Sequence, residues 1–430
     1  MACSCWAAGW LTSSDGDDCF VGGLIGFALA SAAGGLAADF SLLVVARAVQ
    51  GIAAAAVAPA ALSILTTSFH GPVRTRVLGY YGATASVGFV LGLVLGGVLV
   101  QIAGWRAVFF VNVPICLVCA ALGRRITTAG AAPATRPHLD VIGACFVTAG
   151  MATLVYAPTA GVDSGWGSLP FFAALASSGV LLTAFVLHER RTPQPLVPLT
   201  IFRSRTLAAG DGVTLLLGAW NAGEVLLLSL YLQQALGYSP LLTGVAVLPQ
   251  GVAGLVRGAV GASLVARLGI KHFLLGSTAV AAIGLALLLR FPATSRYPLL
   301  GFVLFVVGFG TTSTAFAATV AGSAGVTDDE QGLASALINA ARQVGAALGV
   351  ATLLSIAAAK SQTGSAADLA DGYRTAMGVT TVLAVAAGAI SLAFVHGRVC
   401  QRQQEHLRRR HLDHPWPLPE LLGHRQVAHD

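Results

Sequence analysis

Long apolar stretches, each close to the length that crosses a lipid bilayer, dominate this sequence. A hydrocarbon core of about 30 Å holds no water for backbone groups, so each crossing must be a helix of roughly 20 apolar residues. Twelve such helices are predicted, at 20–40, 42–69, 77–101, 108–122, 141–160, 171–187, 207–233, 241–265, 273–289, 299–321, 332–358 and 376–395. Charged residues are 10% of the 430 positions, against about 25% in soluble domains. We therefore predict an all-α polytopic membrane protein with about twelve transmembrane helices.

The net charge of +7 does not indicate a nucleic-acid-binding surface, because the basic residues are distributed as membrane topology requires. Basic residues collect in alternate loops and in the C-terminal tail. Such loops stay in the cytoplasm under the positive-inside rule. We expect a multi-pass protein of the plasma membrane with both ends of the helical part in the cytoplasm, the lipid bilayer as a partner and no nucleic acid. The sequence does not indicate an oligomeric state.

The seven cysteines do not form a readable disulfide framework. Cys116 and Cys119 form a CxxC, but it lies inside a predicted span and no second pair accompanies it. A zinc site would need two such pairs or added histidines. We expect no metal and no disulfide, and we interpret the histidine-rich tail as a solvated basic end that touches anionic lipid.

Two loops rich in proline and charge divide the chain unevenly. They predict seven segments: 1–19 outside the helical part, 20–123 with four spans, a cytoplasmic linker at 124–139, two further spans at 140–188, a cytoplasmic loop at 189–206, a six-helix bundle at 207–396, and a basic tail at 397–430. The four-span and six-span bundles are unequal. This asymmetry indicates that spans are missing at the front.

Glycines recur at helical spacing in two of the predicted spans. Gly88, Gly92 and Gly96, with Gly97 beside them, form a stripe of small residues, and Gly345 and Gly349 repeat the spacing late in the chain. Such stripes let two helices approach closely. Plain helix packing explains the glycines by themselves, and their similar places in two bundles suggest the internal repeats of secondary transporters.

Several motifs, in order, resemble the major facilitator superfamily, and within it the fourteen-span drug:proton antiporters. The motifs are RAVQGIAAA from Arg47, GWRAVFFVNVPI from Gly104, PLVPLTIFRSRTLA from Pro195, YLQQALGYSPLLTGVAVLP from Tyr231 and GLASALINAARQVGAALGVA from Gly332. The resemblance covers about 20–397. It implies that the visible spans are the family's third to fourteenth, and that its first two are absent.

Residues 1–19 do not resemble those two spans, since Asp15, Asp17 and Asp18 interrupt the short apolar stretch in this segment. Back-translated with mostly GC-ending codons and read in another frame, they give GLLLLGGRLADLFGRRRL, which resembles the family's loop between its second and third spans. We expect this segment to be an out-of-frame translation, which the nucleotide sequence would decide. An N-terminally truncated, inactive remnant is therefore the alternative to an active transporter.

The resemblance also carries two imperfect motifs. GASLVARLGIKH, from Gly261, resembles a second copy of that cytoplasmic loop, with Ala266 where an acid is usual. Its Arg267 and Lys271 would hold helix ends together during rocking, or simply set topology. GLVLGG, from Gly92, has Leu93 where the antiporter pattern carries proline, which weakens the antiport assignment relative to the superfamily assignment.

Ionisable side chains inside the predicted spans are candidates for function, because burying each costs about 2.5–3.5 kcal/mol. Glu224 is the strongest, with Trp220 and Asn221 near it on the helix. Desolvation disfavours its ionised form, so it can load and release a proton. A buried structural ion pair with Arg257 is the alternative. Asp211 lies about 220° around the same helix and suits a snorkelling or helix N-terminal acid better than a coupling site.

Two further groups of polar residues lie in predicted spans. Arg47, with Gln50 on the same face, resembles the family's arginine that tunes proton binding. Asn339, Arg342 and Gln343 either line a substrate cavity or pack against another helix. The candidates for a substrate cavity or gate are these three residues together with Gln50, Trp220, Asn221 and Arg257.

The expected function is that of a secondary active transporter which exports a drug-like or antibiotic small molecule in exchange for protons. No bound cofactor is expected, since no GxxxxGKS or GxxxxGKT occurs and the proton gradient supplies the energy. A membrane-embedded enzyme is less favoured, because the spans hold almost no histidine to pair with a nucleophile or a second acid.

Overall fold

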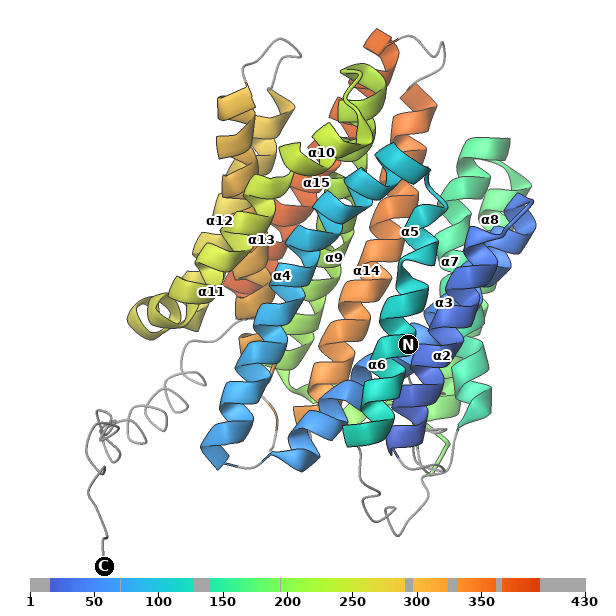
Figure 1. Cartoon of the computed structure of the whole chain (residues 1–430), viewed down its shortest axis with the longest axis vertical. Coiled ribbons are helices and arrows are strands. Elements are labelled where there is room, and N and C mark those ends of the chain that lie inside the picture. Colours follow the sequence, from blue (N-terminus) through green and yellow to red (C-terminus); the bar gives the residue numbers. More distant parts are fainter. Residues whose placement is uncertain are drawn as a thin grey trace, which may run out of the picture.

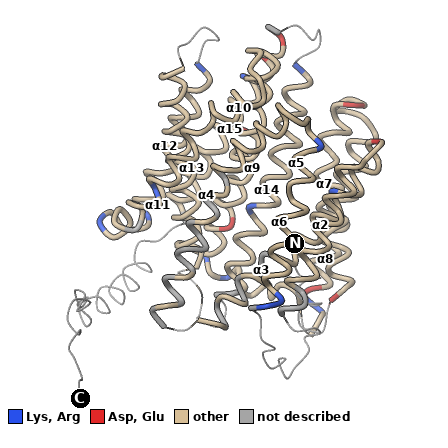
Figure 2. The backbone as a smooth tube through the Cα atoms, viewed as in Figure 1, with Lys and Arg blue, Asp and Glu red and all other residues tan. Residues whose placement is uncertain are grey.

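The computed structural model describes residues 16–69, 71–126, 140–193, 195–290, 297–323, 326, 331–360 and 366–394. Within these ranges the chain is helical and contains no strand. Most of the predicted linker at 124–139, residues 1–15 of the first segment and the basic tail at 397–430 lie outside them. Charged residues gather toward the two ends of the helices, and few lie midway along them (Figure 2).

The helices run roughly side by side along one direction (Figure 1). The first half of the chain forms α2 (Gly16–Gly35), α3 (Phe40–Ser68), α4 (Gly71–Ala103), α5 (Ala107–Phe110), α6 (Asn112–Ile126), α7 (Val141–Ser164) and α8 (Leu169–Glu189). The second half forms η1 (Leu199–Arg203), α9 (Arg205–Leu230), η2 (Tyr231–Ala235), α10 (Pro240–Ala246), α11 (Leu248–Leu268), α12 (Ile270–Leu289), α13 (Tyr297–Ser323), α14 (Gln331–Lys360) and α15 (Ala366–Phe394).

Ten stretches in the described residues are long and apolar enough to cross a membrane, and 20–35 and 90–103 are shorter apolar helices. These twelve correspond in order to the twelve predicted spans. Three starts were placed too late: α2 begins at Gly16, so Asp17 and Asp18 form part of its first turn, α4 begins at Gly71 rather than Val77, and α15 begins at Ala366 rather than Ala376. Hydropathy marks only the apolar part of a helix, and these three helices extend beyond it through first turns that contain charged residues.

Local chemistry explains where several helices begin. Ser168, Ser204 and Ser239 each accept a hydrogen bond from the backbone N–H three residues later, which caps α8, α9 and α10. These bonds satisfy amide groups that have no partner in the first helical turn. The predicted span at 241–265 is divided at Val247, which precedes α11, and Pro249 lies in the first turn of that helix.

The second half of the chain has a large apolar core. Trp220, Leu274, Leu304 and Leu353, from four different helices, are each at most 1% exposed within it. Helix α9 packs against α13, α14 and α15, and α12 packs against α13 and α15. α9 therefore lies inside this bundle.

Helix α14 approaches α9 so closely that only glycine fits at the contacts. A Cβ atom on Gly345 would meet the carbonyl of Leu215, and one on Gly349 would meet the carbonyl of Ala219. From the other side, a Cβ on Gly218 would meet the carbonyl of Arg342. Backbone thus lies directly against backbone along this pair of helices.

In the first half, α2 packs against α3 and α6, and Val21, Leu24, Ala28, Cys116 and Ala120 form a small core there. Helix α4 instead lies against α10 and α11 of the second half (Figure 1).

Contrary to the sequence-based expectation, no described atom lies within 4 Å of where a Cβ would stand on Gly88, Gly92 or Gly96. Gly97 does pack closely, against the carbonyl of Pro240. The reason is that α4 presents the face carrying Gly97 to α10, so the glycine stripe itself has no described neighbour.

We expect Gly345→Ala to lower the stability of the protein by about 1–3 kcal/mol, because the added methyl group overlaps the carbonyl of Leu215 and forces α9 and α14 apart. Thermal unfolding of the detergent-solubilised protein measures the change. Gly92→Ala is the matched control, and its midpoint should equal that of the wild type or exceed it. Equal midpoints for the two variants would contradict the close approach.

Candidate functional site

Glu224 lies in the centre of the second bundle and is almost completely shielded from solvent. Its side chain is 1% exposed, and the apolar residues around α9 surround it. The Nε2 atom of Gln250 donates to both carboxylate oxygens, at 2.9 Å from Oε1 and 3.1 Å from Oε2. A buried carboxylate needs such partners, since water cannot solvate it. Helices α9 and α11 thus supply the two halves of one polar contact.

Gln250 was not singled out from the sequence. It is 5% exposed, and its own Oε1 has no hydrogen-bond partner. A Cβ on Gly308 of α13 would lie 2.6 Å from the Cα of Gln250. The absence of a side chain at Gly308 therefore allows α11 to pack closely against α13 at this position. The sequence signal that could have identified Gln250 is a polar amide residue within an apolar stretch, directly after Pro249.

Trp220 and Asn221 stand one turn before Glu224, in different surroundings. Trp220 is fully buried, and its Nε1 donates to the hydroxyl of Thr311 at 3.3 Å. Asn221 is half-buried. The structure therefore places Trp220 in the packed core around Glu224 and Asn221 at its margin.

Arg257 does not pair with Glu224, which corrects the alternative drawn from the sequence. Its guanidinium lies over the ring of Phe316, 5.2 Å from the centroid, and its Nε has no hydrogen-bond partner. Arg257 follows Gln250 by seven residues of α11, or about 10 Å along the axis. The residue that faces Glu224 from α11 is accordingly the neutral amide.

Asp211 is also separate from Glu224. It lies in the second turn of α9, thirteen residues earlier, which is about 20 Å along a helix. The side chain is half-buried, and Oδ1 has no hydrogen-bond partner. The structure gives no contact through which the two acids could act as a pair.

In the first half of the chain, Arg47 and Gln50 form a short polar chain between α3 and α2. Arg47 Nη1 donates to Gln50 Oε1 at 3.0 Å, and Gln50 Nε2 donates to Ser31 Oγ at 2.6 Å. The guanidinium also lies 4.6 Å from the centroid of the Phe109 ring. Arg47 is therefore held by an amide and a ring, and a role in proton binding stays a prediction.

The remaining predicted positions lie on surfaces or at turns. On α14, Arg342 Nη2 donates to Asn339 Oδ1 at 2.7 Å, and Asn339, Arg342 and Gln343 are all exposed. Arg267 lies in the last turn of α11 and Lys271 in the first turn of α12, with Gly269 at a φ of 77° between the two helices. That left-handed conformation suits glycine and turns the chain in a single residue.

Comparisons with known proteins agree on one family. The sequence pattern of the Major Facilitator Superfamily matches residues 7–350, so the match starts inside the segment 1–19. The puromycin resistance protein of Streptomyces alboniger is 38% identical over 391 residues, covering 87% of this chain and 76% of that protein. The cephamycin export protein of Amycolatopsis lactamdurans is 37% identical over 364 residues, covering 82% and 74%.

A solved structure supports the same architecture. An auto-inhibited peptide transporter of the POT family superposes with a TM-score of 0.65, covering 94% of this chain and 86% of that one. At 15% identity this likeness concerns the fold alone. From the sequence match and these relatives, the chain is a multi-pass membrane protein that belongs to the Major Facilitator Superfamily of transporters.

Proposed function

We propose that this protein exports an amphipathic, drug-like or antibiotic molecule across the plasma membrane in exchange for protons, with both ends of its helical part in the cytoplasm. Support for the substrate class comes from two relatives, one named for puromycin resistance and one for cephamycin export. The substrate, protons and the bilayer are its partners, and no bound cofactor is required.

The observation that carries the proton part of the proposal is Glu224. Burying a carboxyl group this deep in a membrane bundle costs free energy, and the ionisable residues found there usually have a function. The hydrogen-bond partner of Glu224 is an amide rather than a cation. An arginine partner would hold the carboxylate ionised. An amide allows the group to exist in both protonation states, which a proton-coupling residue needs.

Gln250 suits both states of Glu224. Its Nε2 donates to the carboxyl oxygens in the structure, and its unpaired Oε1 can accept from the acid when a proton is bound. A rotation of the amide would exchange the two arrangements. Loading and release of a proton would then leave no buried charge without a partner.

Transport itself would follow the rocking of two bundles about a central site. One proton that moves inward through about 100 mV releases about 2.3 kcal/mol. That free energy supports roughly a fiftyfold gradient of a neutral substrate at one-to-one exchange. A single coupling carboxyl group is therefore sufficient for useful export.

Glu224→Gln is expected to abolish proton-driven export of a fluorescent cationic dye, because the amide fills the same space but cannot exchange a proton. Proteoliposomes with an imposed pH gradient measure this directly. Asp371→Asn, which removes an exposed acid at the start of α15, is the control and should export at the wild-type rate. Equal export by Glu224→Gln and wild type would exclude Glu224 as the coupling acid.

Gln250→Leu is expected to destabilise the folded protein by about 1–3 kcal/mol, since the carboxylate of Glu224 loses its hydrogen-bond donor. In a Glu224→Leu background the same substitution should cost much less, because no polar group is left without a partner. Thermal unfolding in detergent closes this double-mutant cycle. Additive losses would show that the two side chains do not interact.

A further inference from the structure

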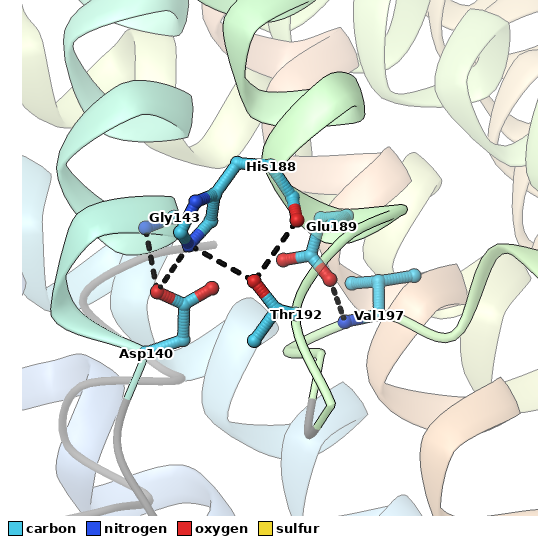
Figure 3. Close-up of polar contacts among 6 residues, drawn as sticks. All are labelled: Asp140, Gly143, His188, Glu189, Thr192 and Val197. Carbon is cyan, nitrogen blue, oxygen red and sulfur yellow. Dashed lines mark hydrogen bonds and ion pairs between the residues drawn. The ribbon is translucent and has the colours of Figure 1, made fainter.

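A second group of buried acids lies far from Glu224 in the sequence, where α7 begins and α8 ends (Figure 3). Asp140 precedes α7 and Glu189 is the last residue of α8, so the helical hairpin brings together two residues that are 49 positions apart. The side chain of Asp140 is 7% exposed, and Glu189 is 4% exposed.

One oxygen of each acid is fixed by good hydrogen bonds. Oδ1 of Asp140 accepts from the backbone N–H of Gly143 at 2.9 Å and lies 2.8 Å from Nε2 of His188. Oε2 of Glu189 accepts from the backbone N–H of Val197 at 3.2 Å. Thr192 holds His188 in place, since its hydroxyl donates to the His188 carbonyl at 2.9 Å.

The other oxygen of each acid has no partner. Asp140 Oδ2 and Glu189 Oε1 are both buried and make no hydrogen bond. Both border one point, where a Cβ atom on Gly143 would stand: Glu189 Oε1 is 3.2 Å from it, and Asp140 Oδ2 is nearer. Figure 3 shows these two oxygens turned toward one another.

Among the residues that the structure describes, the charges around the two acids do not compensate them fully. Within this part of the chain, Asp140 and His188 are the charged or titratable groups that act on Glu189, and Arg190 and Arg191 are exposed. The side chains of Ala144, Val147 and Leu196 pack beside the cluster, and the backbone N–H of Leu196 also acts on Glu189. No charged group from the described part of α14 acts on Glu189. Two desolvated carboxylates with one imidazole leave an excess of negative charge.

We propose that Asp140 and Glu189 bind one proton between them, at a site separate from Glu224. A proton on either unpaired oxygen removes the repulsion between two buried like charges and supplies the missing donor. This site does not depend on the proposed export, because it rests only on the geometry of the α7–α8 hairpin.

The acid pair lies where the hairpin is connected to the second bundle. Glu189 holds Val197, and Val197 is buried with Ile201, Leu207 of α9 and Leu337 of α14. With the shared proton, the arrangement in the structure binds more protons than one in which the hairpin is unpacked and water reaches both carboxylates. Its stability is therefore greatest at low pH and falls as the pH of that side rises.

Infrared difference spectroscopy of the full-length protein in lipid tests the proposal, because a protonated carboxyl group has its own carbonyl stretching band. We expect one such band to titrate in the wild type and to be lost in both Asp140→Asn and Glu189→Gln. It should persist in Asp163→Asn, which removes an exposed acid from the same helix, and in Glu224→Gln, whether or not the protein exports a dye.

Persistence of the band in either Asp140→Asn or Glu189→Gln would overturn the shared proton. So would a band that sodium ions remove at constant pH, since the site would then hold a metal cation instead. Gly143→Ala provides a test that keeps every ionisable group, because its methyl group would lie against both unpaired oxygens. An unchanged titration in that variant would also refute the pairing.

Discussion

The contact of α9 with α14, backbone against backbone, determines how the second half of the molecule is built. Gly218, Gly345 and Gly349 remove the side chains that would hold the two helices apart. α9 can then be enclosed by α13, α14 and α15, which excludes solvent from its middle. The burial of Glu224 is a consequence of this arrangement, because an acid on an outer helix would reach lipid headgroups or water.

A carboxyl group enclosed in this way needs a partner from another helix, and Gln250 supplies it. The approach of α11 requires glycine again, at Gly308 of α13. Small residues at two helix contacts therefore support one polar contact between α9 and α11. The two acids of the α7–α8 hairpin follow the same principle, since Gly143 provides the space beside their unpaired oxygens.

The sequence predicted what depends on a continuous run of residues. Apolar length indicated the twelve helices, and an acid in an apolar run indicated Glu224. Partners were out of reach, since Gln250 is distant in sequence and an amide alone carries no strong signal. Glycine spacing predicted faces for close approach at Gly345 and Gly92, but only packing decides which face meets a neighbour. Asp140 was equally invisible, because its relation to Glu189 exists only once α7 and α8 lie side by side.

Helix α4 belongs to the first half of the chain but lies against α10 and α11 of the second. Gly97 faces the carbonyl of Pro240, and Gly244 faces the carbonyl of Leu93, so backbone rather than interlocking side chains forms these points of contact. Side chains of α4 add to these contacts, since Leu93 packs against the core of the second half and Val90 occupies the space beside Gly251. A methyl group added at Gly97 or Gly244 would therefore separate the two halves of the molecule at a contact that their side chains alone do not make.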